Sequence, residues 1–486
     1  MTRLGAFVLR LGRYAATAIA GAFIGAAVFG IYLTRSGPSL EIWHNHELDA
    51  EFTRGREDDI RTFEDYLGLE QRLFAALDTD VYARVSTGPA YTLARYSAGS
   101  AADPRPRQPN WNRSYEHATA APVGGVLLLH GMSDSPYSLR ALGKAFAGRG
   151  YWVVGLRLPG HGTIPSALTR TRWEDMAAAV RLGVRHLRAE IGSAPLHIVG
   201  YSTGAPLAID YVLEADDDED AVAPKSLVLI SPALGVTRVA ALARWRDRLS
   251  VLPGLDRLAW TSVLPEFDPY KYNSFATNAA DQVYRLTRSV ATRIETRAAA
   301  GPIGDFPPTL VFLSAVDATV TAGAVIDNLL EHLAPGRHEL VLFDINRASI
   351  NSTVLIDDPG PLTRRLMTDD ELPFALTVVT NERDDSFRVV SRRKSPRSAM
   401  VTLEPLDLSW PAGVISLSHV ALPFSPDDPL YGRRRPDAPD ELQLGQIAMQ
   451  GELGVLRVPS DWLLRLRHNP FYEFLSERTF DWMAGS

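Results

Sequence analysis

The sequence contains no cysteine, and this absence excludes several kinds of chemistry. Disulfide bonds, zinc–thiolate sites and a cysteine nucleophile are ruled out, whereas the redox compartment stays open because a cysteine-free chain suits oxidising and reducing environments alike. A long basic stretch is also lacking, and the formal net charge at pH 7 is -7. Because a nucleic-acid-binding surface requires clustered Lys and Arg, this charge balance argues against a nucleic-acid partner.

The length and composition are those of a globular protein with a substantial core. The chain has 486 residues, which allows about two or three domains. Hydrophobic residues make up 46% of it and charged residues 22%, and both fractions are ordinary for a folded protein.

Residues 14–33 form an uncharged apolar run that is long enough to cross a membrane. The run, YAATAIAGAFIGAAVFGIYL, has the roughly 20 residues that a helix needs to span a hydrocarbon core of ~30 Å. Three arginines precede it and one follows nearby: Arg3, Arg10, Arg13 and Arg35. This asymmetry predicts a single-pass anchor with the rest of the chain on the non-cytoplasmic side, the periplasm in a bacterium. A signal peptide cleaved near Ala26 and a buried helix of a soluble domain are the alternatives.

The rest of the chain divides by composition. Residues 40–120 are predicted to form a helical extension, with an amphipathic helix at 62–77, followed by a Pro-rich linker at 97–111. From residue 121 to residue 486, short apolar runs alternate with helical stretches, which predicts an α/β domain with a doubly wound, mostly parallel sheet. The predicted core strands are Val126–Leu129, Trp152–Leu156, Leu196–Val199, Leu227–Ile230, Leu310–Leu313 and Leu340–Phe343.

Two long stretches interrupt this alternation. Residues from about 235 to 305 are helical and rich in arginine, and residues from about 347 to 412 contain β-like runs. Loops of such length are uncommon without structure of their own. We therefore predict a helical cap in the first stretch and a β-rich inserted subdomain in the second.

Ser202 stands in the pattern G-x-S-x-G, within Gly200-Tyr201-Ser202-Thr203-Gly204. An apolar strand precedes the motif and a helical pattern follows it, which is the context in which the motif presents a nucleophile. The glycines allow the sharp turn that lifts the serine oxygen above the sheet. We interpret Ser202 as a catalytic nucleophile rather than a polar residue of an ordinary turn.

A serine nucleophile needs a histidine base and an acid that orients the histidine. In this chain order the acid follows the next-to-last core strand, where Asp317 stands, and the histidine comes later. His419 ends a strand-like run and opens a Pro/Asp-rich loop, so it is the preferred base. His468, just before a predicted terminal helix, is the alternative.

The oxyanion of acyl transfer needs two preorganised N–H donors. One is expected from Thr203, which follows the nucleophile, and the other from Met132, in the loop after the first core strand. His130 and His161, which lie in Gly-bounded loops, and His197, inside a strand, are interpreted as structural.

These motifs together resemble the α/β-hydrolases, in particular the serine aminopeptidase/monoacylglycerol lipase-like branch. The resemblance rests on HGM at residues 130–132, LPGHG at 158–162, GYSTG at 200–204 and Asp317, and it covers roughly residues 121–346 and resumes near His419. The chain departs from the family by the long insertion before His419. The fold hosts many chemistries, so the resemblance implies the triad more firmly than the substrate.

The hypothesis from the sequence is a membrane-anchored serine hydrolase that cleaves a carboxylic ester, such as a monoacylglycerol or a lysolipid, through an acyl-enzyme on Ser202. It needs neither metal nor organic cofactor. One alternative is an aminopeptidase-type amide hydrolase with the same triad, for which an acidic group must receive the substrate amine, whereas an acyl pocket is mainly apolar. A catalytically inactive hydrolase fold that serves as a binding protein is the other.

Overall fold

The computed structural model describes residues 12–18, 20, 21, 25, 38–215, 222–235, 256–317, 320–350, 358–438, 441–445 and 466–485. Most of the predicted membrane-spanning run at 14–33, and residues 236–255 of the predicted cap, lie outside these residues. Among the described helices, none combines the length and the apolar character that crossing a bilayer requires.

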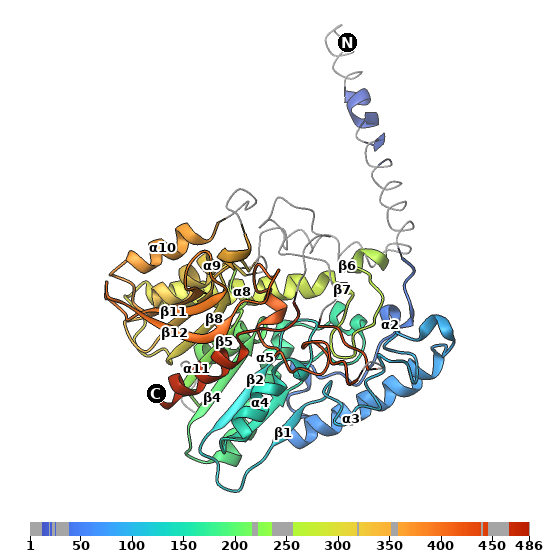
Figure 1. The fold of residues 1–486 in the computed structure, drawn as a ribbon. Coiled ribbons are helices and arrows are strands. Elements are labelled where there is room, and N and C mark those ends of the chain that lie inside the picture. The colour runs from blue at the N-terminus through green and yellow to red at the C-terminus, as the bar shows by residue number, and fades with distance from the viewer. Residues whose placement is uncertain are drawn as a thin grey trace, which may run out of the picture.

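Ten strands of the described chain form one sheet, in the order β1-β3-β2-β4-β5-β8-β9-β10-β11-β12 (Figure 1). The strands are β1 (Tyr115–His117), β2 (Gly125–Leu129), β3 (Trp152–Leu156), β4 (Leu196–Tyr201), β5 (Ser226–Ile230), β8 (Thr309–Ser314), β9 (Glu339–Phe343), β10 (Ala375–Asn381), β11 (Arg388–Lys394) and β12 (Val401–Ser409). Neighbours from β3 to β10 pair in parallel, and β1, β11 and β12 pair antiparallel at the two ends. Each predicted core strand lies inside an observed one, and the doubly wound, mostly parallel sheet is confirmed.

Successive side chains of the parallel strands enter opposite layers of the core, which is why the strands are continuously apolar. In β2, Leu127 and Leu129 pack with α5, α6 and α8, whereas Val126 and Leu128 pack with α4 and α11. The helices that cover the sheet are α4 (Arg140–Ala147), α5 (Trp173–Ile191), α6 (Gly204–Ala215), α8 (Thr277–Ala298), α9 (Ala322–Asn328), α10 (Gly360–Thr368) and α11 (Tyr472–Ala484). The result is a sheet between two helical layers.

The stretch at 347–412 is not a separate subdomain, which corrects the prediction of an inserted one. Its strands β10, β11 and β12 continue the central sheet beyond β9. Every residue of β10 is buried, with Leu376 in one layer of the core and Val379 in the other. A strand that is apolar on both faces needs a layer on each side, and extending the existing sheet supplies both.

The predicted cap, about 235–305, also ends earlier than expected. Its described part holds a small two-stranded sheet, β6 (Trp260–Ser262) with β7 (Phe275–Ala276), but α8 belongs to the core. Leu286, Val290 and Ile294 are spaced four residues apart, so they form one stripe on α8, and they are buried in the same cluster as α5 and α6.

The N-terminal extension packs on the hydrolase-like core. It contains α2 (Ile42–Asn45) and α3 (Phe63–Asp80), which in Figure 1 lie toward the β1 side of the sheet, opposite β11 and β12. Thr62 begins the amphipathic helix by accepting a hydrogen bond from the N–H of Asp65. Residues 97–111 are not an extended linker: Ala102 and Asp103 are buried, and short turns that hydrogen-bond internally fold the segment against α3.

Arg157, at the end of β3, ties the extension to the core. Its side chain is completely buried and lies 3.0 Å from both Glu51 and Glu70 of the extension. Tyr66 of α3 also donates its hydroxyl to the Arg157 carbonyl at 2.6 Å. A buried charge is tolerated only when its partners are in place, so the core and the extension depend on each other.

Candidate active site

Ser202 occupies a strained turn between β4 and α6. Its φ is +52°, in the left-handed region that residues other than glycine seldom adopt. The flanking glycines leave no room for a side chain. A Cβ atom on Gly200 would lie 2.5 Å from the carbonyl oxygen of Gly204, and a Cβ on Gly204 would lie 2.1 Å from the carbonyl oxygen of Leu129. The motif therefore contains glycine at these positions because the turn admits nothing larger.

Ser202, His419 and Asp317 form one hydrogen-bonded chain. The Oγ of Ser202 lies 2.9 Å from Nε2 of His419, and Nδ1 of His419 lies 2.9 Å from Oδ2 of Asp317. With the ring proton on Nδ1, His419 donates to Asp317 and accepts from the Ser202 hydroxyl. The Asp317 side chain is fully buried and that of His419 nearly so. This is the arrangement in which a histidine can take the serine proton.

Each member stands just beyond the carboxyl edge of the parallel strands, where α/β folds place their sites. Asp317 follows β8, and its second oxygen accepts a hydrogen bond from the N–H of Val320 at 2.9 Å. The run before His419 is not a strand, but Asn346, just after β9, holds it: the Asn346 N–H donates to Ile415 at 2.7 Å, and its side-chain amide donates to Val414 at 2.8 Å. This contact brings the segment that follows β12 back to the carboxyl end of β9.

The predicted oxyanion donors lie on either side of the serine. Thr203 follows Ser202 directly, and Met132 is in the loop after β2. Gly131 brings that loop against the serine, since a Cβ on it would lie 2.9 Å from the Ser202 Cβ. Neither the Met132 N–H nor the Thr203 N–H donates to another residue in the part of the chain that the structure describes.

The other histidines of the sequence motifs support the backbone. His130 accepts a hydrogen bond from the Leu158 N–H at 3.1 Å and lies edge-on to His161. Burial lowers the pKa of His161, and that of His197 in β4, to about 4, so both rings stay neutral. His468, the alternative base, lies 3.1 Å through Nδ1 from the carbonyl oxygen of Tyr431, and the ring within hydrogen-bonding distance of Ser202 is that of His419.

The structure also places a buried acid, not predicted from the sequence, in the loop of residues 130–135, which is called the oxyanion loop here because it carries the predicted donor Met132. Asp134 lies 3.3 Å from the ammonium of Lys271, and a Cβ on Gly131 would lie 2.9 Å from its other carboxylate oxygen. Burial raises the pKa of Asp134, while the nearby charges of Lys271 and His419 act in the opposite direction. No local pattern could reveal the pair, because its members belong to the oxyanion loop and to the region around β7.

A second missed group fixes the loop that carries His419. The fully buried carboxylate of Asp428 lies 2.7 Å from Arg140 and accepts the hydroxyl of Tyr137 at 2.9 Å. Arg140 begins α4, and Tyr137 lies in the 3-10 turn Pro136–Leu139 between the oxyanion loop and α4. The Asp428 group therefore joins the loop that carries His419 to the oxyanion loop.

No cluster of three or more His, Asp or Glu side chains suited to hold a metal ion occurs among the described residues.

Comparison with known proteins identifies relatives of the region that contains Ser202 and Asp317. Residues 120–344 match the family described as serine aminopeptidase, S33. A thermostable monoacylglycerol lipase of Bacillus sp. (strain H-257) is 28% identical over 227 residues, which are 46% of this chain and 82% of that enzyme.

Solved structures give similar coverage. The monoacylglycerol lipase of Paleococcus ferrophilus is 20% identical, with a TM-score of 0.35 over 47% of this chain and 87% of that one. A soluble variant of monoglyceride lipase from Saccharomyces cerevisiae is 15% identical, with a TM-score of 0.36 over 47% of this chain and 81% of that one. By strand order, by the strained serine turn and by this family match, residues 120–344 resemble the serine hydrolases of the α/β-hydrolase superfamily.

Proposed function

We propose that the enzyme hydrolyses a carboxylic ester of the monoacylglycerol or lysolipid type through an acyl-enzyme on Ser202. The observation that carries the proposal is the hydrogen-bonded chain from Ser202 through His419 to Asp317, next to two N–H groups that have no acceptor in the described structure. The ester class is supported by the relative that is a monoacylglycerol lipase.

Each residue has a defined part in the proposed reaction. The Ser202 oxygen attacks the carbonyl carbon while Nε2 of His419 takes its proton, and Asp317 stabilises the imidazolium that forms. The N–H groups of Met132 and Thr203 bind the oxyanion. The C–O bond then breaks, and His419 gives its proton to the departing alcohol. His419 then takes a proton from a water molecule, whose oxygen attacks the acyl-enzyme carbonyl. The bond to Ser202 breaks, His419 returns the proton to the Ser202 oxygen, and the acid is released.

The pairing of Asp134 favours an ester over an aminoacyl amide. An aminopeptidase needs a carboxylate that receives the substrate ammonium. Asp134 is the carboxylate of the oxyanion loop, and Lys271 already neutralises it. A substrate ammonium would therefore compete with a fixed ammonium for one acceptor, and a charge buried without a partner is strongly disfavoured.

We therefore expect the purified enzyme to cleave monoacyl esters with a kcat/KM roughly 100-fold or more above that for aminoacyl amides, because an ammonium without an acceptor costs several kcal/mol to bury. The measurement is a panel of esters of graded chain length beside aminoacyl amides of the same leaving group. Faster cleavage of the amides would reject the ester assignment. Absence of any turnover, and of labelling by a fluorophosphonate probe, would point to the inactive binding protein.

We further propose that residues 14–33 anchor the enzyme in a membrane, with the catalytic domain on the non-cytoplasmic side. The arginine bias and the uncharged length support this. A groove of about 460 Å³ also lies beside Pro38, where the described chain resumes after the run. Leu93 and Leu264 on this groove are 54% and 50% exposed, so an apolar surface lies on the same groove as Pro38.

The membrane proposal predicts that the full chain stays in the membrane fraction after high salt and carbonate. External protease should digest the catalytic domain in bacterial spheroplasts, and deletion of residues 1–35 should release a domain that still cleaves small esters, because no triad residue lies in that segment. Release of the full chain by carbonate would contradict the anchor, and complete protection from protease would contradict the orientation.

A further inference from the structure

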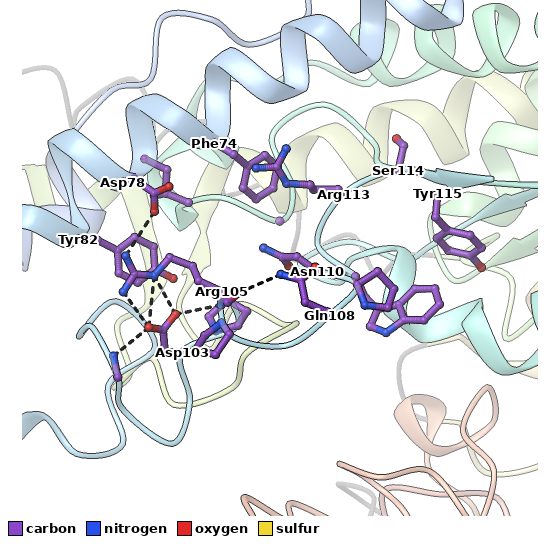
Figure 2. Close-up of a pocket in the computed structure, with 17 residues that line it drawn as sticks. Phe74, Asp78, Tyr82, Asp103, Arg105, Gln108, Asn110, Arg113, Ser114 and Tyr115 are labelled. Carbon is purple, nitrogen blue, oxygen red and sulfur yellow. Dashed lines mark hydrogen bonds and ion pairs between the residues drawn. The ribbon is translucent and has the colours of Figure 1, made fainter.

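A cavity of about 750 Å³ lies outside the active site, between α3 and the segment of residues 99–115 (Figure 2). Apart from Gly162, every residue that lines it precedes residue 116, so almost the whole wall comes from the N-terminal extension and the segment that follows it. The family match begins at residue 120, so apart from Gly162 the wall of this cavity lies outside the matched region.

The charges on one side of the cavity neutralise one another. Arg105 lies 2.8 Å from Asp103 and 3.4 Å from Asp78. Its Nε donates to Oδ1 of Asp103 at 3.0 Å and its Nη2 donates to Oδ2 at 2.8 Å, which gives a bidentate pair (Figure 2). Both carboxylates in the cavity wall thus pair with this one guanidinium, and Asp103 also accepts the backbone N–H groups of Gly99 and Arg105.

Arg113, on the opposite side, has no such partner. Its guanidinium lies over the ring of Phe74 at 4.2 Å, and it forms no hydrogen bond or ion pair with the residues that the structure describes. Burial lowers the pKa of this half-buried side chain, and the charges of Glu70 and Asp78 offset the effect only in part. The ring contact fixes the plane of the guanidinium, but it leaves the N–H groups without acceptors.

Two neutral side chains add donors to the same wall. The side-chain oxygen of Asn110 accepts from the backbone and the side-chain amide of Asn112, so the remaining polar group of Asn110 is its NH₂. The indole of Trp111 lies 5.3 Å from the Lys144 ammonium, measured to the ring centroid. No hydrogen bond from the Asn110 NH₂ or the Trp111 Nε1 occurs among the described residues. Arg113, Asn110 and Gln108 are among the labelled side chains that line the cavity in Figure 2.

We propose that this cavity is a binding site for an anionic group, a phosphate or a carboxylate, held by the guanidinium of Arg113. A planar guanidinium presents paired N–H donors that match these oxyanions. The apolar lining at Leu77, Pro106 and Pro109 would receive an uncharged part of the same molecule. The anion comes either from a free metabolite or from a lipid headgroup, and the site does not depend on the reaction at Ser202.

The test is the thermal unfolding of the full chain in neutral detergent, with inorganic phosphate, with acetate, and with phosphatidylcholine micelles that do or do not contain phosphatidic acid. Arg113→Met keeps the length of the side chain and its contact with Phe74 but removes the charge. Arg107→Met is the matched control: it removes the same charge from a residue that does not line the cavity and whose guanidinium donates to Ala101.

We expect the wild type and Arg107→Met to be stabilised by an anion, and Arg113→Met to bind it roughly tenfold or more weakly, because a hydrogen bond to a charged group is lost. Stabilisation by phosphate or acetate identifies a free anion, and stabilisation only with phosphatidic acid identifies a headgroup.

Without anion, Arg113→Met should unfold at no lower temperature than the wild type, since the substitution removes a charge that has no ion-pair partner among the described residues. Equal anion effects on Arg113→Met and the wild type, or no effect on the wild type, would overturn the proposal. Arg113→Lys provides a second variant, with charge but without the paired donors, and should bind with intermediate affinity.

Discussion

Ser202→Ala is expected to lower kcat for a short activated ester by about a millionfold, the typical loss when the nucleophile of such a triad is removed. The reason is the geometry at the turn: the oxygen that lies 2.9 Å from Nε2 of His419 is the one that the substitution deletes. Folding should be unaffected, because alanine has the same backbone freedom as serine at φ +52°. The measurement is turnover of the purified variant together with its thermal unfolding.

The two histidines give the control for this prediction. His419→Ala should reduce turnover nearly as far as Ser202→Ala, whereas His468→Ala should keep most of it, because the His468 ring is engaged with the Tyr431 carbonyl. A folded Ser202→Ala protein with undiminished turnover would refute the mechanism. Loss of activity in His468→Ala but not in His419→Ala would move the base to His468.

Arg157→Met is expected to reduce the free energy of unfolding by about 3–5 kcal/mol, the cost of leaving a buried charge without its partner. Glu70 is the charge left behind: its side chain is 2% exposed, and its pKa is already raised by burial even with Arg157 in place. Denaturant-induced unfolding of the full chain measures the loss. The double variant Arg157→Met, Glu70→Gln should recover part of it, because the amide carries no charge to bury.

Arg170→Met is the matched control for Arg157→Met. Arg170 also pairs with a glutamate of the extension, Glu47, but the two side chains are 67% and 49% exposed. Water solvates both charges after the pair is broken, so little stability should be lost. If Arg157→Met and Arg170→Met unfold alike, the buried contact does not join the extension to the core as we describe.

Strands that are apolar on both faces could be predicted from the sequence because their local pattern is unambiguous. β10 was assigned to an inserted subdomain because the stretch at 347–412 is long for a loop, and the local pattern of β10 does not show which strand it pairs with. Two of its buried residues are threonines, Thr377 and Thr380, whose hydroxyls donate to Glu339 and Asp344. These acceptors lie in and just after β9, so no local pattern shows that the threonines are satisfied inside a sheet.

The same distinction holds at the candidate site. Ser202 and Asp317 could be placed because the strands before them set the position of each at the sheet edge. The choice of His419 over His468 rested on loop context alone, and the hydrogen bonds from Asn346 that hold the loop could not be foreseen. Contacts such as Asp134 with Lys271 join distant segments, so they follow only from the folded chain.

The two edge strands of the sheet, β1 and β12, affect whether two molecules of this protein can pair through their sheets. β1 has only three residues, and β12 carries Pro405 in its middle, with Glu404 and Asp407 exposed beside it. A proline has no N–H to offer to an incoming strand, and like charges on neighbouring copies repel. These two features disfavour growth of the ten-stranded sheet from one molecule into the next at either end.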